Sequence, residues 1–288
     1  MLVYIQYNNK QYPITVEEKE IIAELKIKIE TFIGISTDRI ELYHDTILLD
    51  SNSHTLQSYH IVNESVITIK LLPPQIKTTY LFPSITIFSI CAILMIYFST
   101  EAKFLPDITD PIDMTALIAN CILICWFVAH SLFSIVFDNP IKKSIDMTKA
   151  ILISVSSTII VSFVIYEVNY NRYQTSPLGS IIGAIFCINC LMMLLYQHYQ
   201  LSKCYNELGD MIKYPSVGLF KIISCPNHLF EGLFFTAFAF CCNFTMCSVI
   251  FCIINWIVMM ILARSQLHDY QMTFKNYKIK YAIIPFIW

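Results

Sequence analysis

The stretch of sequence that decides the fold class reads GLFFTAFAFCCNFTMCSVIFCIINWIVMMILA and occupies residues 232–263, without a single charged side chain. A straight helix of this length, at ~1.5 Å per residue, would measure roughly 48 Å, well beyond the ~30 Å hydrocarbon core of a bilayer. We therefore predict the end of one helix, a break near Cys242 and Asn243, and then a second helix. Both helices belong to a body embedded in the membrane.

Further uncharged stretches lie upstream of this one. They cover residues 78–100, 114–137, 150–166 and 173–202. If the segment from about 217 to 240 also crosses the bilayer, in spite of Lys221 and Glu231, the chain has about six transmembrane helices. The sequence thus predicts an all-α polytopic membrane domain over residues 80–288.

The charged residues are concentrated before this body. The chain is 56% apolar and 14% charged, but residues 1–77 alone hold 7 Lys/Arg and 10 Asp/Glu, and the remaining 211 positions hold 12 and 11. A polar module of ordinary composition therefore precedes the membrane domain. The net charge of −2 gives no reason to expect nucleic acid as a partner.

The polar module shows alternating strands around one helix. Val3, Ile5 and Tyr7 alternate with polar residues, and Asn8-Asn9 form a turn into a second run over residues 11–16. Thr15 and Glu18 fit a capping box that would begin a helix, with Gly34 at its C-cap. Shorter apolar runs follow at residues 40–42, 47–49 and 66–71. The expected order is ββαβ(β)β, an α+β fold.

Cysteine usage and the N-terminus indicate how the chain is handled in the cell. The first 77 residues contain none of the eleven cysteines, and several lie in the uncharged stretches, so we expect small apolar side chains and not a disulfide framework. The opening residues lack a basic segment followed by an apolar one. We therefore expect no cleavable signal peptide.

The loops predict how the body is oriented. The loop over residues 101–113 carries four acidic residues against one lysine, whereas the loop over 138–149, the segment after Ser202 and the C-terminal tail carry most of the lysines. Basic loops stay in the cytosol. With six crossings and a cytosolic N-terminal module, both termini are predicted to be cytosolic.

The side chains that could do chemistry are few. The body contains His130, His198, His228 and His268, but none is spaced from another as a metal-binding pair, so we predict no metal site. Glycine-rich phosphate loops and a GxSxG motif are also absent from the sequence. His228 and Glu231 stand three residues apart in an apolar segment, and ionisable groups there are functional candidates. The tail after His268 fits an amphipathic segment at the membrane interface.

Two family resemblances bear on these features. Residues 1–72, which end in TLQSYHIVNESVITIKLL, resemble the ubiquitin fold, but Leu71-Leu72-Pro73-Pro74 replaces the free diglycine tail, so conjugation is excluded. The segment SCPNHLFE, residues 224–231, resembles the SCPNYxxE segment of trans-2-enoyl-CoA reductases. The ending ARSQLHDYQMTFKNYKIKYAIIPFIW resembles their closing motif. The implied layout is a ubiquitin-like domain over 1–72, a linker over 73–79, and a steroid 5α-reductase-like transmembrane domain over 80–288.

The reductase resemblance implies a function and a set of roles. The family reduces the 2,3 double bond of very-long-chain enoyl-CoA with NADPH, the last step of fatty-acid elongation in the endoplasmic reticulum. The implied partners are the acyl-CoA substrate, membrane lipid and other enzymes of the elongation cycle. The implied catalytic residues are His228 and Glu231. The implied cofactor-binding residues are Asn189, Asn227, Arg264, His268, Tyr270, Tyr277 and Lys280.

The sequence departs from the family at several positions. His228 replaces the tyrosine proposed as proton donor, and an imidazolium can also donate a proton near neutral pH. Met193 and Gln197 replace a histidine and an arginine of the cofactor segment, and His130 or Ala129 occupies the basic position of the second helix. Either other groups such as Lys203, Arg264 and Lys275 hold the cofactor, or activity is weak or absent. The alternatives are therefore a steroid or polyprenol double-bond reductase and a non-catalytic membrane scaffold.

Overall fold

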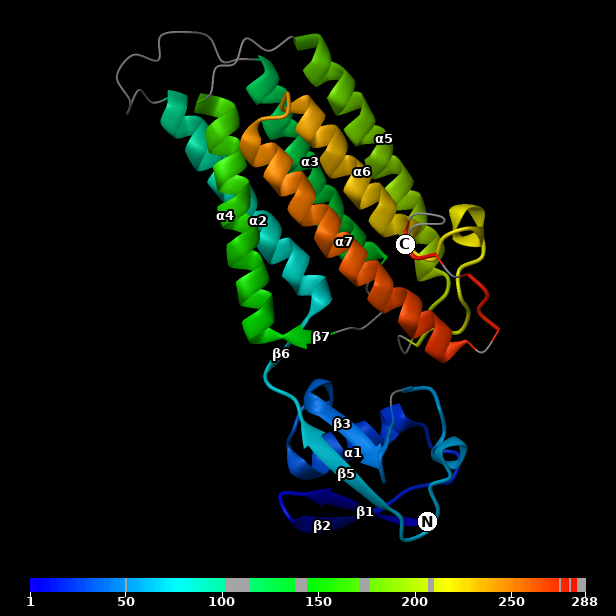
Figure 1. Ribbon diagram of the computed structural model, residues 1–288. Helices are drawn as coiled ribbons and strands as arrows, with labels where there is room; N and C mark the ends of the chain where they lie inside the picture. Colours follow the sequence, from blue (N-terminus) through cyan, green and yellow to red (C-terminus); the bar gives the residue numbers. More distant parts are fainter. Residues whose placement is uncertain are drawn as a thin grey trace. The chain divides into compact units, whose positions relative to one another are not determined.

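The chain forms two compact units (Figure 1). The computed structural model describes residues 1–49, 51–101, 114–137, 144–170, 177–206, 210–274, 276–279 and 281–283. The first unit, here the N-terminal unit, contains residues 1–78 with parts of the segments 140–151 and 205–212. The second, here the helical unit, contains the rest of the chain.

The N-terminal unit is a five-stranded sheet crossed by one helix. Its elements are β1 (Leu2–Tyr7), β2 (Lys10–Thr15), α1 (Ile22–Ile33), a 3-10 turn (Thr37–Arg39), β3 (Ile40–His44), β4 (Ile47–Leu48), a 3-10 turn (Leu56–Tyr59) and β5 (Val66–Leu71). The strand order is β2-β1-β5-β3-β4, in which β1 and β5 are parallel. The alternating residues of β1 and the apolar face of α1 close one core, including Val3, Ile5, Leu25 and Ile67. This is the predicted α+β order.

The start of α1 differs from the prediction. Thr15 is the last residue of β2, and the helix begins at Ile22. Glu20 explains the delay, because its carboxylate accepts the Glu17 amide at 3.0 Å and lies 2.7 Å from the Lys28 ammonium. Glu24 then accepts the Ile21 amide at 3.3 Å, which satisfies one free N–H of the first turn. The predicted C-cap is confirmed, since Gly34 adopts a φ of 77° and donates to the Glu30 carbonyl.

Two later segments of the chain belong to the N-terminal unit. The predicted linker, residues 73–79, contains β6 (Gln75–Lys77), which pairs antiparallel with β7 (Ser144–Asp146). In addition, the Asp210 carboxylate accepts the backbone amides of Asn52 and Ser53, at 3.3 and 2.7 Å. The sequence does not predict either contact, because the partners are far apart along the chain.

The helical unit contains six described helices. They are α2 (Thr78–Glu101), α3 (Met114–Val136), α4 (Met147–Tyr170), α5 (Pro177–Ser202), α6 (Pro226–Cys241) and α7 (Met246–Thr273), with a 3-10 turn (Gly218–Lys221) before α6. The break predicted near Cys242 and Asn243 is confirmed. The segment from 217 does not form one helix, because α6 begins only at Pro226, a residue suited to the first helical position.

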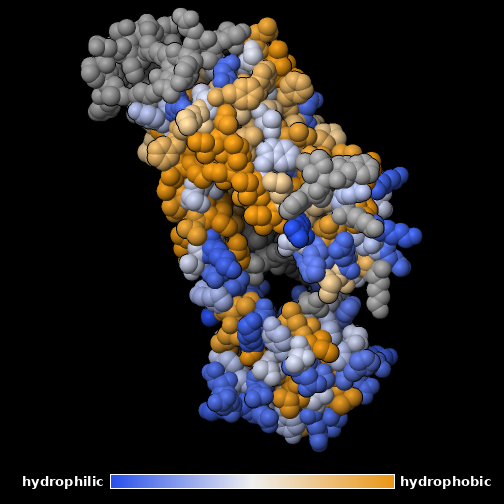
Figure 2. Space-filling view, viewed as in Figure 1, coloured by the Kyte–Doolittle hydropathy of each residue, from blue (hydrophilic) through white to orange (hydrophobic). Residues whose placement is uncertain are grey.

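Within the described residues, four helices are long and apolar enough to cross a membrane. They cover 115–136, 147–169, 178–202 and 246–273. The apolar part of α2 is shorter, at 80–96, and α6 has 16 residues, so the predicted count of about six crossings is not confirmed. Apolar side chains cover much of the visible face of this unit, whereas hydrophilic ones predominate on the N-terminal unit (Figure 2). All eleven cysteines are described, and each is a free thiol.

Two glycines bring α6 close to its neighbours. A Cβ atom on Gly183 of α5 would lie 2.7 Å from the Cys241 backbone, and one on Gly232 would lie 2.8 Å from the Trp256 indole of α7. On a third side, Trp126 of α3 stacks on Phe234 with ring centroids 4.1 Å apart. Helix α6 is therefore packed among α3, α5 and α7, which buries most of its residues.

Candidate active site

The beginning of α6 is fixed by the C-terminal tail. The Ser224 and Cys225 amides donate to the Tyr281 and Ala282 carbonyls, both at 2.9 Å. Cys225, Ala263, Ala282 and Ile283 then form one buried cluster. Residues 281–283 of the tail thus pack onto the helices, and the pairing of 224–225 with 281–282 satisfies backbone polar groups that an apolar surrounding could not. That the tail as a whole is an amphipathic interfacial segment stays a prediction.

A buried carboxylate lies one turn into this helix. Glu231 is 7% exposed, and its two oxygens each face an imidazole. The Nδ1 atom of His228 lies 3.4 Å from Oε2, and the Nε2 atom of His130 lies 3.4 Å from Oε1. The spacing of His228 and Glu231 predicted that they share one helix face, and the structure brings them together. His130, from α3, was noted in the sequence without being assigned to this site.

Aromatic rings enclose His130. Its ring centroid lies 4.3 Å from that of Trp126, 5.4 Å from that of Phe82 and 6.1 Å from that of Phe133. Trp126 precedes His130 by one helical turn, a spacing that stacks their side chains on one face. This spacing is the only local pattern in the sequence that indicates an aromatic neighbour for His130. The rings limit the positions that the His130 imidazole can take.

Two buried amide oxygens of α5 and α6 have no hydrogen-bond partner among the described residues, namely Asn227 Oδ1 at the start of α6 and Gln197 Oε1 on α5. Ser224 Oγ, by contrast, lies within hydrogen-bonding reach of the Tyr277 phenol. Helices α5 and α6 run antiparallel, with Cys187 Sγ 3.8 Å from the Phe234 carbonyl. Gln197, ten residues further along α5, therefore lies toward the end of α5 that neighbours the start of α6. An unpaired buried polar group costs about 1–3 kcal/mol. These oxygens are therefore candidates for hydrogen bonds to a bound molecule.

Two tyrosines of the family tail lie beside this segment. Tyr270 is buried, its hydroxyl accepts from the Gln266 amide, and its ring centroid lies 5.4 Å from that of Tyr277. Tyr277 also packs against Tyr214, at 5.1 Å. Burial raises the pKa of Tyr277 to about 12. Its phenol is therefore neutral at physiological pH and able to donate a hydrogen bond.

The other predicted cofactor residues are not part of this cluster. Asn189 is exposed on α5 and donates to the Ile185 carbonyl of its own helix at 2.8 Å. Arg264 and His268 are exposed on α7. Lys280 lies outside the described residues. Across the described residues, no group of three histidine, cysteine or acidic side chains is arranged to hold a metal ion.

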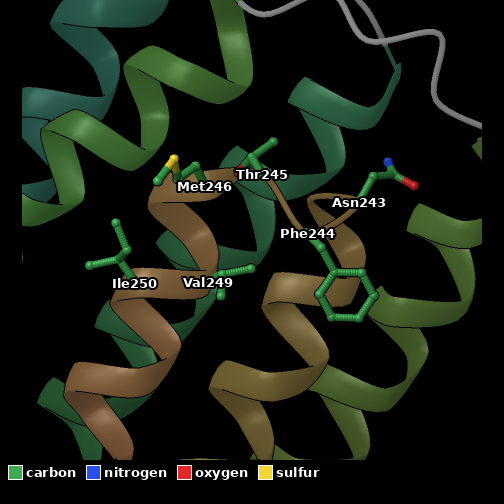
Figure 3. Close-up of a pocket in the computed structure, with 6 residues that line it drawn as sticks. All are labelled: Asn243, Phe244, Thr245, Met246, Val249 and Ile250. Carbon is green, nitrogen blue, oxygen red and sulfur yellow. The ribbon is translucent and has the colours of Figure 1, made fainter.

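A pocket of about 560 Å³ lies at the opposite end of α6 (Figure 3). Its lining comes from the turn between α6 and α7 and from the first residues of α7, namely Asn243, Phe244, Thr245, Met246, Val249 and Ile250. Twelve residues separate Glu231 from Asn243, which corresponds to roughly 18 Å along a helix. The pocket is thus separate from the histidine–carboxylate cluster and contains no ionisable side chain in its lining.

Comparisons with known proteins agree with this division of the chain. Residues 3–72 match the ubiquitin family. A similar solved structure is the solution structure of a ubiquitin-like domain from an Arabidopsis thaliana protein, with 28% sequence identity and a TM-score of 0.24. The match covers 25% of this chain and 76% of the Arabidopsis domain. No curated protein matches the chain.

The apolar helices and the buried polar site define a multi-pass membrane protein with an N-terminal ubiquitin-like domain. Residues 140–288, just over half of the chain, match the family described as 3-oxo-5-alpha-steroid 4-dehydrogenase. The chain belongs to this family of the steroid 5α-reductase superfamily. That membership supports an oxidoreductase that acts on a carbon–carbon bond.

Proposed function

We propose that this protein reduces the 2,3 double bond of a very-long-chain trans-2-enoyl-CoA with NADPH. The observation that supports the proposal is the contact between His228 and Glu231 at the buried start of α6, where Asn227 also lies, in a chain of a reductase family. The same segment carries the resemblance to enoyl-CoA reductases. The proposed setting is the endoplasmic reticulum membrane, with both termini in the cytosol and the elongation-cycle enzymes as partners.

The chemistry requires a hydride and a proton. A nicotinamide cofactor, when bound, supplies the hydride for the β-carbon of the enoyl thioester. In our proposal His228 supplies the proton for the α-carbon, and its imidazolium becomes a neutral imidazole. Solvent then returns a proton to the ring. The thioester is the electron-withdrawing group that makes the β-carbon receptive.

The residues of the site fit one part of such a cofactor well. The unpaired oxygens of Asn227 and Gln197 are acceptors for a carboxamide NH₂ group, and the neutral phenol of Tyr277 is a donor. For phosphate groups, Arg264 is the only arginine among the described residues of the helical unit. Lys203 directly follows the last residue of α5, and its Nζ atom lies 3.9 Å from the centroid of the Tyr199 ring. These two side chains are the proposed phosphate contacts.

The deciding experiment is NADPH oxidation by the purified, detergent-solubilised protein. We expect turnover with a long-chain trans-2-enoyl-CoA and little with a steroid 4-ene-3-one. His228→Phe should lower kcat by roughly 10²–10⁴-fold, since it removes the proton donor. His228→Tyr, which installs the family residue, should retain activity.

A surface histidine provides the matched control. His60 is exposed in the N-terminal unit with a φ of 56°, a conformation that asparagine also adopts. His60→Asn should therefore leave turnover unchanged. Preference for the steroid would assign the protein to the steroid branch. The absence of NADPH oxidation with both substrates, together with no NADPH binding by calorimetry, would instead favour the non-catalytic scaffold.

A further inference from the structure

We propose that Glu231 and His130 fix the tautomer of His228, so that its Nε2 atom is the one that exchanges a proton with a ligand. His130 then acts as a positioning residue, a role that the family motifs do not assign to it. The consequence for catalysis rests on the proposed function, whereas the tautomer is a property of the protein itself.

The Glu231 carboxylate determines which nitrogen of His228 carries the hydrogen. An ionised carboxylate accepts hydrogen bonds and cannot donate them. The nitrogen of His228 that faces Glu231 is Nδ1, at 3.4 Å from Oε2. That contact is favourable only when Nδ1 carries the hydrogen. In the neutral imidazole the other nitrogen, Nε2, is then the unprotonated one.

A second imidazole faces the Glu231 carboxylate from its other side. A buried charge is costly unless its oxygens have partners. Oε1 of Glu231 faces His130 Nε2 at 3.4 Å, a contact from a different helix that is an ion pair when the His130 ring is protonated and is too poorly aligned to be a hydrogen bond. His130 is itself confined by Trp126 and Phe82. Each carboxylate oxygen thus has one imidazole, and rotation of Glu231 would break both contacts.

Among the described residues, other charged side chains do not compete for the Glu231 carboxylate. On α5, the ring centroid of His198 lies 6.3 Å from that of His130. His198 is therefore a neighbour of His130 and is not one of the two imidazoles in contact with Glu231. No other charged side chain in the described residues lies within 4 Å of the Glu231 carboxylate. The orientation of His228 therefore depends on Glu231, and that of Glu231 depends on both histidines.

This arrangement suits a histidine at a position where the family motif has tyrosine. A phenol carries one proton on one atom, so it has no tautomer to select. An imidazole has two nitrogens, and as a proton donor it must present the correct one. With Nδ1–H held by Glu231, the imidazolium loses its proton from Nε2 and regains one at the same atom. The logic is that of a carboxylate that orients a catalytic imidazole.

The test is ¹⁵N NMR of protein with labelled histidine, in detergent micelles at a pH where the neutral ring is populated. The His228 signals are assigned by their absence from His228→Tyr. We expect the Nδ1–H tautomer to dominate in the unsubstituted protein. In Glu231→Leu, and to a smaller extent in His130→Leu, the signals should shift toward the Nε2–H tautomer that free histidine favours. A dominant Nε2–H form in the unsubstituted protein would overturn the proposal.

A conservative pair separates positioning from packing. His130→Gln retains an N–H donor for Glu231, whereas His130→Leu retains bulk without a donor. We expect His130→Leu to lower kcat on the order of 10²-fold with KM nearly unchanged, and His130→Gln to recover most of that loss. Equal losses in both variants, with the tautomer unchanged, would mean that His130 only fills space. If the protein reduces no enoyl-CoA, the NMR result still decides the tautomer.

Discussion

At the scale of single residues, Tyr277 connects the tail to the segment that starts α6. Burial raises the pKa of its phenol from 10.0 to about 12, because the ionised form would lose its hydration. Below pH 10 both the folded and the unfolded chain hold the proton. Between about pH 10 and 12 the unfolded chain can lose it more easily, so the stability that depends on this residue falls as pH rises through that window.

The measurement that checks this is the absorbance of tyrosinate against pH, compared with thermal stability over the same range. Tyr277→Phe should remove one late-titrating phenol. It should also make the stability of the helical unit less sensitive to pH above 10. If Tyr277 titrated with the exposed tyrosines near pH 10, the phenol would not be buried against the segment that starts α6.

Gly232, next to Glu231, is required by the closeness of α6 and α7. A Cβ atom there would lie 2.8 Å from the Trp256 indole, whose Nε1 is held by Thr236 Oγ1 at 2.9 Å. Overpacking of this kind costs about 1–3 kcal/mol, against a helix-propensity gain of up to ~1 kcal/mol for alanine. We expect Gly232→Ala to lower the melting temperature by a few degrees.

Gly179 offers the matched control in α5. A Cβ atom there meets only Asn243 Oδ1, at the ordinary contact distance of 3.5 Å. Gly179→Ala should therefore leave the melting temperature unchanged or raise it slightly. If the two alanine variants behaved alike, the close approach of Gly232 and Trp256 would be incorrect.

At the scale of elements, Asp210 contacts the turn at Asn52 and Ser53, so a segment from the C-terminal half of the sequence belongs to the N-terminal unit. The Asp210 carboxylate accepts two backbone amides, and its own backbone is held by Asn206 at 2.8 Å and 3.0 Å. Hydrogen bonds to a charged group contribute about 1.5–3 kcal/mol each at most, and less where water can replace them.

We expect Asp210→Ala to speed hydrogen exchange at the Asn52 and Ser53 amides, and Asp210→Asn to have a smaller effect, because its amide oxygen can still accept. Glu18→Ala, which changes an exposed acidic residue of the same unit, is the control and should leave these amides unchanged. Equal exchange in all three variants would show that the segment around Asp210 does not protect the turn.

At the scale of the whole molecule, the sequence predicts those features that depend on local pattern. Alternation predicts β1, glycine predicts the end of α1, and the length of an uncharged run predicts the break between α6 and α7. The i, i+3 spacing likewise predicts that His228 and Glu231 meet. Each of these needs only neighbours in sequence.

Features that depend on distant partners could not be predicted in this way. His130 is about a hundred residues from Glu231, and β6 pairs with a strand nearly seventy residues away. The delayed start of α1 is different, since it depends on two glutamates that accept different backbone amides, Glu20 that of Glu17 and Glu24 that of Ile21. The roles assigned to the site residues stay predictions, because the geometry brings side chains together without showing what they bind.

The exposed cysteines of α3 can show whether this helix is surrounded by lipid or by water. Cys121 and Cys125 are exposed on the helix over 115–136, which is long and apolar enough to span a bilayer. If lipid covers that surface, a water-soluble maleimide cannot reach either thiol in intact membranes. We expect labelling of these residues only after detergent solubilisation. Gln57→Cys places a thiol at an exposed position of the N-terminal unit. In membranes whose two sides are both accessible to the reagent, and also in detergent, this thiol should be labelled.

Labelling read by mass spectrometry distinguishes the three residues. Rapid modification of Cys121 and Cys125 in membranes, at the rate of Gln57→Cys, would mean that α3 faces water and is not a spanning helix. We expect the two thiols to be protected from the reagent because apolar side chains such as Leu132 and Ile135 are also exposed on α3. Exposure of these side chains to water would be unfavourable in free energy. A helix of this length with so large an apolar surface is stable outside the bilayer only if another apolar surface covers it.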